Sequence, residues 1–288
     1  MPRTLKITLA YDGTAYCGWQ RQTNGVSIQG LLERALSPIE GSPVTVHGAG
    51  RTDAGVHALG QVASAIVSSA LDLHTLRRAL NASLPSDVRV VAVDEMPDGF
   101  HARFSATCKA YEYWIFEGDV QPPFARVWSW HHPRTLDAAA MDRAAWAIVG
   151  TRDFSAFQSS RTDVKTVVRT VRHASVRTEP AHVGPGAPAD RPASPGAGGR
   201  FVVIRIEANG FLRHMVRAIA GTLVEIGEGR READTLPAII ASRDRAAAGA
   251  TAPARGLVLL HVDYSACPVL VSDRQCSASG IANPKSVS

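Results

Sequence analysis

The chain has 288 residues, 45% of them hydrophobic and 20% charged, which is enough apolar material for one large core or two smaller ones. Its formal net charge of +5 favours a polyanionic partner without identifying it. The sequence shows neither an apolar run of about 18 residues nor a basic-then-apolar leader, so we expect a cytoplasmic protein. The four cysteines lack metal-ligand spacing and are expected to be reduced thiols.

The first part of the chain predicts strands alternating with helices. Apolar residues alternate from Leu5 to Tyr11, which is typical of a half-buried strand. From Ser27 to Leu36 they recur at helical spacing, with Ser27 as the N-cap. The pattern then predicts a strand over 43–48, a helix near 75–81 and a strand over 88–93. This order of elements is that of an α+β protein.

The second part of the chain repeats this style. The sequence predicts a strand over 110–116, followed by a helix that Asp137 opens. Strands rich in β-branched residues follow over 165–178 and 200–210, and a buried strand over 256–264 closes the pattern. We therefore expect an N-terminal half over residues 1–105 and a C-terminal half over 106–265.

Two segments of biased composition lie outside these elements. Residues 181–199 are dominated by Ala, Gly and Pro and are expected to be disordered, because they cannot bury enough apolar surface to offset ordering. A domain linker is one interpretation of this insert. We prefer a long loop between adjacent strands of one sheet, since loop closure costs little more as length grows. The polar tail, residues 266–288, is also expected to be disordered.

A glycine-rich stretch, "HGAGRTDAGVHA", follows the strand expected over 43–48. Gly50 and Gly55 give backbone freedom on either side of Asp53, as expected for a tight loop that a ligand can approach. The spacing fits neither a P-loop nor a dinucleotide-binding fingerprint. From these residues alone, a turn-forming aspartate explains Asp53 better than a catalytic one.

The segment 211–227 predicts a helix with an apolar stripe, and it places Arg213 and Arg217 four residues apart on another face. A solvated basic face is the common explanation of such a pair. The alternative is that one arginine points into a cleft as the partner of an acid or a phosphate.

Several motifs, taken together and in order, resemble the TruA family of tRNA pseudouridine(38-40) synthases. They span the chain from Tyr11 to about Tyr264: "YDGTAYCGWQRQ" (11–22), "GRTDAGVHA" (50–58), "FHARFSATCKAYEY" (100–113), "DFSAF" (153–157), "FLRHMVRAIAGTL" (211–223) and "GLVL" (256–259). This resemblance reverses the interpretation of Asp53 as a simple turn residue.

The resemblance implies an α+β fold of two similar ferredoxin-like halves, with sheets that meet at a central basic cleft. It implies an isomerase that converts uridine to pseudouridine at positions 38–40, in the anticodon stem-loop of tRNA. It also implies a homodimer across which the tRNA lies. None of the chemical routes considered requires a metal or an organic cofactor.

The same resemblance assigns roles to residues of this sequence. Asp53 matches the nucleophile and Arg217 its ion-pair partner, while Tyr111 matches a tyrosine that contacts the target base. Leu257 matches an apolar residue that lines the pocket. From its position beside Asp53, we expect Arg51 to position RNA phosphates.

Residue chemistry is consistent with these roles. A nearby guanidinium keeps a carboxylate ionised in a cleft, and the target base must be flipped out of the RNA to reach it. One carboxylate suffices because the departing uracil returns as the incoming group, whereas glycoside hydrolysis ordinarily uses two. The sequence leaves open whether Asp53 attacks C1′, adds to the base or removes the C2′ proton.

His57 and His214 are left out of the catalytic set, as histidines with local hydrogen bonds.

Two other classes of protein compete with this hypothesis. A non-catalytic RNA-binding module would keep the pocket without the reaction, and an N-glycosidase would release the base to water. A further expectation concerns the basic stretch 151–178, where arginines next to Phe154 and Phe157 predict a nucleic-acid surface.

Overall fold

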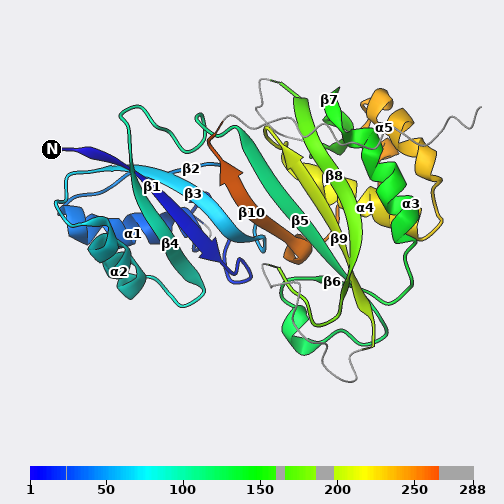
Figure 1. The fold of residues 1–288 in the computed structure, drawn as a ribbon, viewed down its shortest axis with the longest axis horizontal. Helices are drawn as coiled ribbons and strands as arrows, with labels where there is room; N and C mark the ends of the chain where they lie inside the picture. The colour runs from blue at the N-terminus through cyan, green and yellow to red at the C-terminus, as the bar shows by residue number, and fades with distance from the viewer. Residues whose placement is uncertain (24, 160–165, 186–197, 266–288) are drawn as a thin grey trace, which may run out of the picture.

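The computed structural model describes residues 1–23, 25–159, 166–185 and 198–265, and it is built around one mixed sheet (Figure 1). In the described chain the sheet has ten strands, in the order β4-β1-β3-β10-β5-β9-β8-β7, with β2 paired to β3 and β6 paired to β5. The strands are β1 (Arg3–Tyr11), β2 (His47–Gly48), β3 (His57–Val67), β4 (Val88–Met96), β5 (Cys108–Glu117), β6 (Trp130–His132), β7 (Gly150–Asp153), β8 (Val168–Pro180), β9 (Arg200–Ala208) and β10 (Leu257–Asp263).

Five α-helices lie against this sheet in the described residues. They are α1 (Ile28–Glu40), α2 (Leu73–Ser83), α3 (Ala138–Ala145), α4 (Met215–Gly227) and α5 (Leu236–Ser242). Side chains cap the first turns of three of them, since Ser27, Asp72 and Asp137 each accept a hydrogen bond from a backbone N–H three residues on. Short 3₁₀ turns connect the elements: Pro123–Ala125, Trp146–Ile148, Ser155–Phe157, Ala233–Thr235, Arg245–Ala247 and Ala254–Gly256.

The strand order shows two α+β halves joined in the middle of one sheet. Strands β1, β3 and β4 carry α1 and α2, whereas β5, β7, β8 and β9 carry α3 to α5 (Figure 1). Strand β10 comes from the end of the described chain and lies between the halves, parallel to β3 and antiparallel to β5. The α+β fold with two halves is therefore confirmed, and the two expected sheets are continuous through β10.

Apolar packing divides along the two faces of the sheet. The larger of two clusters includes residues of all five helices, and Tyr111, Tyr113 and Ile115 bring β5 into it. The alternate residues Trp114 and Phe116 belong to the smaller cluster on the opposite face. Tyr111 therefore lies on the face of the sheet that the helices cover.

Most elements expected from the sequence are present, but one expected strand is largely absent and the central strand of the sheet was missed. Residues 43–46 are not a strand, because side chains of α1 bind the backbone of Val46: Gln29 donates to its carbonyl at 3.0 Å and Glu33 accepts from its N–H at 3.2 Å. Only β2 remains of the strand predicted there. The central strand β3 was not predicted at all, since it is buried on both faces and shows little polar alternation.

The insert at 181–199 connects neighbouring strands, as we expected. Strands β8 and β9 pair antiparallel, with Pro180 opposite Arg200, which confirms a loop within one sheet rather than a domain linker. Most of the insert and the whole tail 266–288 lie outside the described residues, so the expected disorder of both stays a prediction. The same holds for the boundary between residues 105 and 106.

Candidate active site

Asp53 lies in the loop between β2 and β3, and hydrogen bonds from other segments fix this loop. We call residues 49–56 the Asp53 loop. The N–H of Trp19 donates to the carbonyl of Thr52 at 3.0 Å, and the Thr52 hydroxyl lies 2.9 Å from the hydroxyl of Tyr11. Gln61 donates to the carbonyl of Gly50 at 3.0 Å. The loop therefore has a fixed shape before any ligand binds.

The motif "YDGTAYCGW" supports this loop by close backbone contact. A Cβ on Gly13 would lie 2.0 Å from the carbonyl oxygen of Val56. Gly18 has φ +100°, and a Cβ there would lie 2.5 Å from the carbonyl oxygen of Thr52 and 3.0 Å from the carbonyl carbon of Asp53. Only glycine permits this approach. The first motif thus positions the second, although they are far apart in the sequence.

Replacing Gly18 by alanine is expected to destabilise the protein and displace Asp53. The matched control is Gly41→Ala, because Gly41 also has positive φ (68°) but no atom within 4 Å of its Cβ position. Gly41→Ala is expected to lower the free energy of unfolding by about 1 kcal/mol, because alanine disfavours the left-handed backbone. Gly18→Ala should lower it by roughly 1–3 kcal/mol more, because its Cβ would clash with backbone atoms. Urea unfolding of both variants measures this difference. Equal free energies of unfolding would contradict the role given to Gly18.

Arg217 reaches Asp53 from α4, across the junction between the two halves. Its Nη1 donates to Oδ2 of Asp53 at 3.2 Å, and its Nε donates to the carbonyl of Ala252 at 2.8 Å. The Asp53 side chain is 30% exposed and that of Arg217 is 16% exposed. The arginine is therefore anchored at one nitrogen and presents another to the carboxylate.

A second basic group, His214, contacts the same carboxylate oxygen. Its Nε2 lies 3.4 Å from Oδ2 of Asp53. The residue has φ 63°, a left-handed conformation that is rare outside glycine, and it immediately precedes α4. Burial lowers the pKa of His214, although Asp53 opposes this shift. Within the described residues Oδ2 thus faces two groups, while Oδ1 of Asp53 makes no hydrogen bond.

Tyr111 lies buried on β5, on the face that the helices cover. Its ring meets that of Phe211 edge-on, with centroids 5.0 Å apart. Burial chiefly raises the pKa of its hydroxyl, and the charges of Tyr11 and Asp53 add to this effect, so the phenol stays protonated. Within the described chain that hydroxyl has no hydrogen-bond partner. Leu257, at the start of β10, is also buried and lies opposite Tyr113 on the neighbouring strand β5.

Two further arginines, Arg51 and Arg213, are exposed and do not contact Asp53. Arg51 is exposed on the Asp53 loop, and it makes no hydrogen bond or ion pair with any described residue. Arg213 is exposed and precedes α4, which begins only at Met215, so the expectation that it shares a helix face with Arg217 was wrong. The left-handed backbone of His214 is incompatible with a helix that continues through 211–214.

His57 has a local structural bond. Its Nδ1 accepts a hydrogen bond from the N–H of Gly13 at 3.1 Å, and burial chiefly lowers the pKa of its ring.

The expected nucleic-acid surface over 151–178 is not supported by its aromatic residues. Phe154 and Phe157 are fully buried, so neither can stack on a base. Arg177 is paired with Glu112 at 2.9 Å and with Glu179 at 2.7 Å. Arg161 and Lys165 lie outside the described residues. Arg152, Arg169 and Arg172 form no ion pair with a described carboxylate, and Arg169 lies against Gly210.

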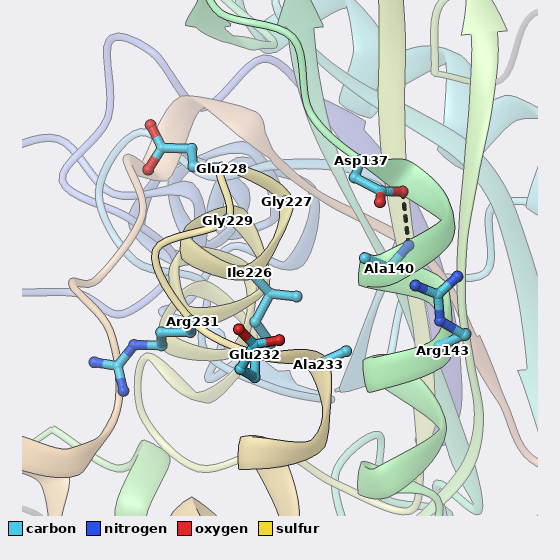
Figure 2. A pocket seen from close by; sticks show the side chains of 10 residues that line it. All are labelled: Asp137, Ala140, Arg143, Ile226, Gly227, Glu228, Gly229, Arg231, Glu232 and Ala233. Atoms are coloured by element: carbon cyan, nitrogen blue, oxygen red, sulfur yellow. Dashed lines mark hydrogen bonds between the residues drawn. The ribbon is translucent and has the colours of Figure 1, made fainter.

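Other described features include a pocket and two cysteines. A pocket lies between α3 and the end of α4, where Asp137 caps α3 through Ala140; none of the predicted site residues lines it (Figure 2). Among the described residues there is no cluster of His, Cys, Asp and Glu that could hold a metal ion. Cys17 and Cys108 are thiols, and Cys267 and Cys276 lie outside the described chain. No described helix is long and apolar enough to cross a membrane.

The class of protein follows from the fold and a family comparison. The chain, in which two α+β halves are joined in one sheet, matches the model of the tRNA pseudouridine synthase family over residues 7–105 and 144–265. These segments reach into both halves and include Asp53, Arg217 and Leu257, whereas Tyr111 lies between them. The fold is accordingly that of a pseudouridine synthase.

Curated relatives give the more particular result. The chain is 42% identical to "tRNA pseudouridine synthase A" of Geotalea uraniireducens over 262 residues, which are 91% of this chain and 100% of that protein. It is 41% identical to the protein of the same name from Acetivibrio thermocellus, again over 91% of this chain and 100% of the relative. The protein belongs to the tRNA pseudouridine synthase family.

Proposed function

We propose that this protein isomerises uridine to pseudouridine at positions 38–40, in the anticodon stem-loop of tRNA. The observation that carries this proposal is the Asp53 carboxylate, which Arg217 holds by one oxygen only. Oδ2 is occupied by Arg217 and His214, so Oδ1 is the oxygen presented to substrate. Such a carboxylate can act on a flipped nucleotide without a second acid.

The chemistry balances within the nucleotide. The bond between N1 of uracil and C1′ breaks, the base turns, and a bond between C5 and C1′ forms. The proton at C5 is lost to solvent, and N1 takes one up. Asp53 carries the reaction, either as a nucleophile that attacks C1′ or adds to the base, or as a base that removes the C2′ proton.

The surrounding residues have positioning roles in this proposal. Tyr111 contacts the flipped base, with its protonated hydroxyl available for a polar contact, and stacking on an aromatic ring contributes roughly 1–3 kcal/mol. Leu257 lines the pocket beside it. The unpaired Arg51 holds a phosphate of the same strand, because it lies within the Asp53 loop and has no partner of its own in the described residues.

The proposal also includes a homodimer across which the tRNA lies, and activity in the cytoplasm. The supporting observations are the ordered motifs of the family and a net charge of +5, which suits a polyanion. Sedimentation of the protein with and without tRNA checks the stoichiometry.

Tritium release tests the proposed function. With tRNA labelled at C5 of uracil, the protein is expected to release tritium to water while the base stays attached to the RNA. No release would favour an RNA-binding module. Free uracil together with abasic RNA would show an N-glycosidase instead.

A further inference from the structure

The motif "FHARFSA" (100–106) builds an exposed aromatic surface beside the Asp53 loop, and nothing in the reaction so far uses it. Phe104 is 77% exposed, which is unusual for a phenylalanine in an ordered loop. Its ring lies on that of His101, with centroids 4.4 Å apart, and His101 lies on His47, with centroids 4.9 Å apart. We call these three side chains the aromatic platform.

Hydrogen bonds hold the platform in place. The N–H of Ser105 donates to the carbonyl of His101 at 2.9 Å, and Ala102 donates to the buried hydroxyl of Ser64 on β3 at 3.0 Å. Nδ1 of His101 accepts from the N–H of Arg103 at 3.0 Å. Exposure of Phe104 is therefore a property of a fixed turn, and a ligand would bind it with little ordering cost.

Three cations lie near one another, and one of them, Arg103, adjoins the platform; Arg103, Lys109 and Arg169 are here called the cation cluster. The Arg103 guanidinium lies 5.6 Å from the centre of the Phe104 ring. Lys109 points from β5 to the Asp53 loop, where its Nζ donates to the carbonyl of Ala49 at 2.7 Å. Strand pairing places Lys109, Ala208 and Val171 in one row across β5, β9 and β8, so Arg169 lies on the same face of the sheet.

The cluster has an excess of positive charge that the described residues do not neutralise. None of its members forms an ion pair with a described carboxylate. Burial, followed by the charges of Arg103 and Arg169, lowers the pKa of Lys109 to about 8. An anion at this point would relieve the repulsion and restore the full charge of the lysine.

The cluster lies next to the site of the target uridine. Lys109 and Tyr111 are two residues apart on the same face of β5, a separation of about 7 Å. A nucleotide that neighbours the flipped uridine could therefore reach both the cluster and the platform. A flat ring with an adjoining set of cations suits a base and its phosphate, and single-stranded RNA is bound elsewhere by this combination.

We propose that Phe104, Arg103, Lys109 and Arg169 form a second nucleotide subsite, in which the base of an unpaired nucleotide next to the target uridine stacks on Phe104 and its phosphate binds the cations. This inference rests on the proposed function for the identity of the RNA. It adds a recognition element for single-stranded RNA beside the reacting nucleotide.

Fluorescence anisotropy with a synthetic anticodon stem-loop RNA tests the subsite. Phe104→Ala is expected to weaken binding roughly 10- to 100-fold, and Phe104→Trp to keep it, because stacking needs only a ring. The matched control is Phe124→Ala, since Phe124 is 89% exposed in a different part of the molecule. Equal affinities of the Phe104→Ala and Phe124→Ala variants for the RNA would overturn the proposal. So would a change in the sedimentation of the RNA-free protein that Phe104→Ala causes and Phe124→Ala does not, because Phe104 would then contact a second copy of the chain.

The cations and the bound nucleotide have tests of their own. Arg103→Gln and Arg169→Gln are each expected to reduce the salt slope of binding by about one, as for a lost phosphate contact. A series of RNAs, each with one abasic loop position, identifies the stacked base. One of these RNAs should bind wild type as weakly as the intact RNA binds the Phe104→Ala variant. That RNA should lose no further affinity when it is tested with the Phe104→Ala variant. Additive losses at every position would contradict stacking on Phe104.

Tritium release by the wild-type protein distinguishes failure of the subsite from failure of the proposed function. If wild type releases tritium while the Phe104→Ala variant binds RNA normally, the subsite fails and the proposed function stands. If wild type releases none, the proposed function fails, whatever the binding data show.

Discussion

Asp53→Asn is expected to abolish tritium release, by roughly 10⁴- to 10⁶-fold, the range seen when a nucleophile is removed. Asparagine keeps the size and shape of the side chain and can still accept a hydrogen bond from Arg217. It lacks the negative charge that every route of the proposed reaction uses. The loss should therefore appear in the chemical step.

Binding should survive this substitution. Because one negative charge is removed from a site that faces a polyanion, the Asp53→Asn variant is expected to bind tRNA at least as tightly as wild type. Asp98→Asn, at an exposed position, is the control and should leave tritium release unchanged. Release from the Asp53→Asn variant at the wild-type rate would contradict the role given to Asp53.

Arg217→Ala is expected to lower the rate of tritium release roughly 10²- to 10³-fold, as for the loss of one preorganised electrostatic group. The substitution removes the cation 3.2 Å from Oδ2 of Asp53 and the hydrogen bond to the carbonyl of Ala252. Arg217→Lys should restore only part of the rate, because an ammonium cannot make both contacts in the same fork geometry.

Arg213→Ala provides the matched control for this experiment. Helical spacing predicts both arginines on one helix face, but Arg213 is exposed and lies outside α4. Its removal should leave the rate of the chemical step unchanged. Equal losses from both substitutions, measured as single-turnover rates, would show that Arg217 has no special relation to Asp53.

Local sequence patterns predicted most of the fold, and they failed where long-range packing decides the structure. The alternation from Leu5 to Tyr11 and the Ser27 cap report interactions within a segment, and both are present. Strand β3 has almost no polar alternation because it is central in the sheet. No local pattern could show that β10 joins the halves, since its partners are distant in the chain.

Some residues of the candidate site were predicted from the sequence, and others could be found only in the folded chain. Asp53 and Arg217 were paired through the family resemblance, and the structure brings their side chains together across 164 positions of sequence. His214 was set aside, yet it lies 3.4 Å from Asp53. Its separation of three residues from Arg217 was the available signal, but the left-handed backbone that turns it to the carboxylate depends on tertiary contacts. The supporting roles of Gly13 and Gly18 likewise needed the folded chain.

The central claim is that the Asp53 carboxylate, held by Arg217, works directly on an extruded uridine. A crystal structure of the Asp53→Asn variant with an anticodon stem-loop RNA tests it most directly. We predict a target uridine flipped out of the loop, its base against Tyr111, with the side chain of residue 53 roughly 3–3.5 Å from the ribose or the base. A uridine that stays stacked within the RNA, with its ribose beyond the reach of residue 53, would contradict the account.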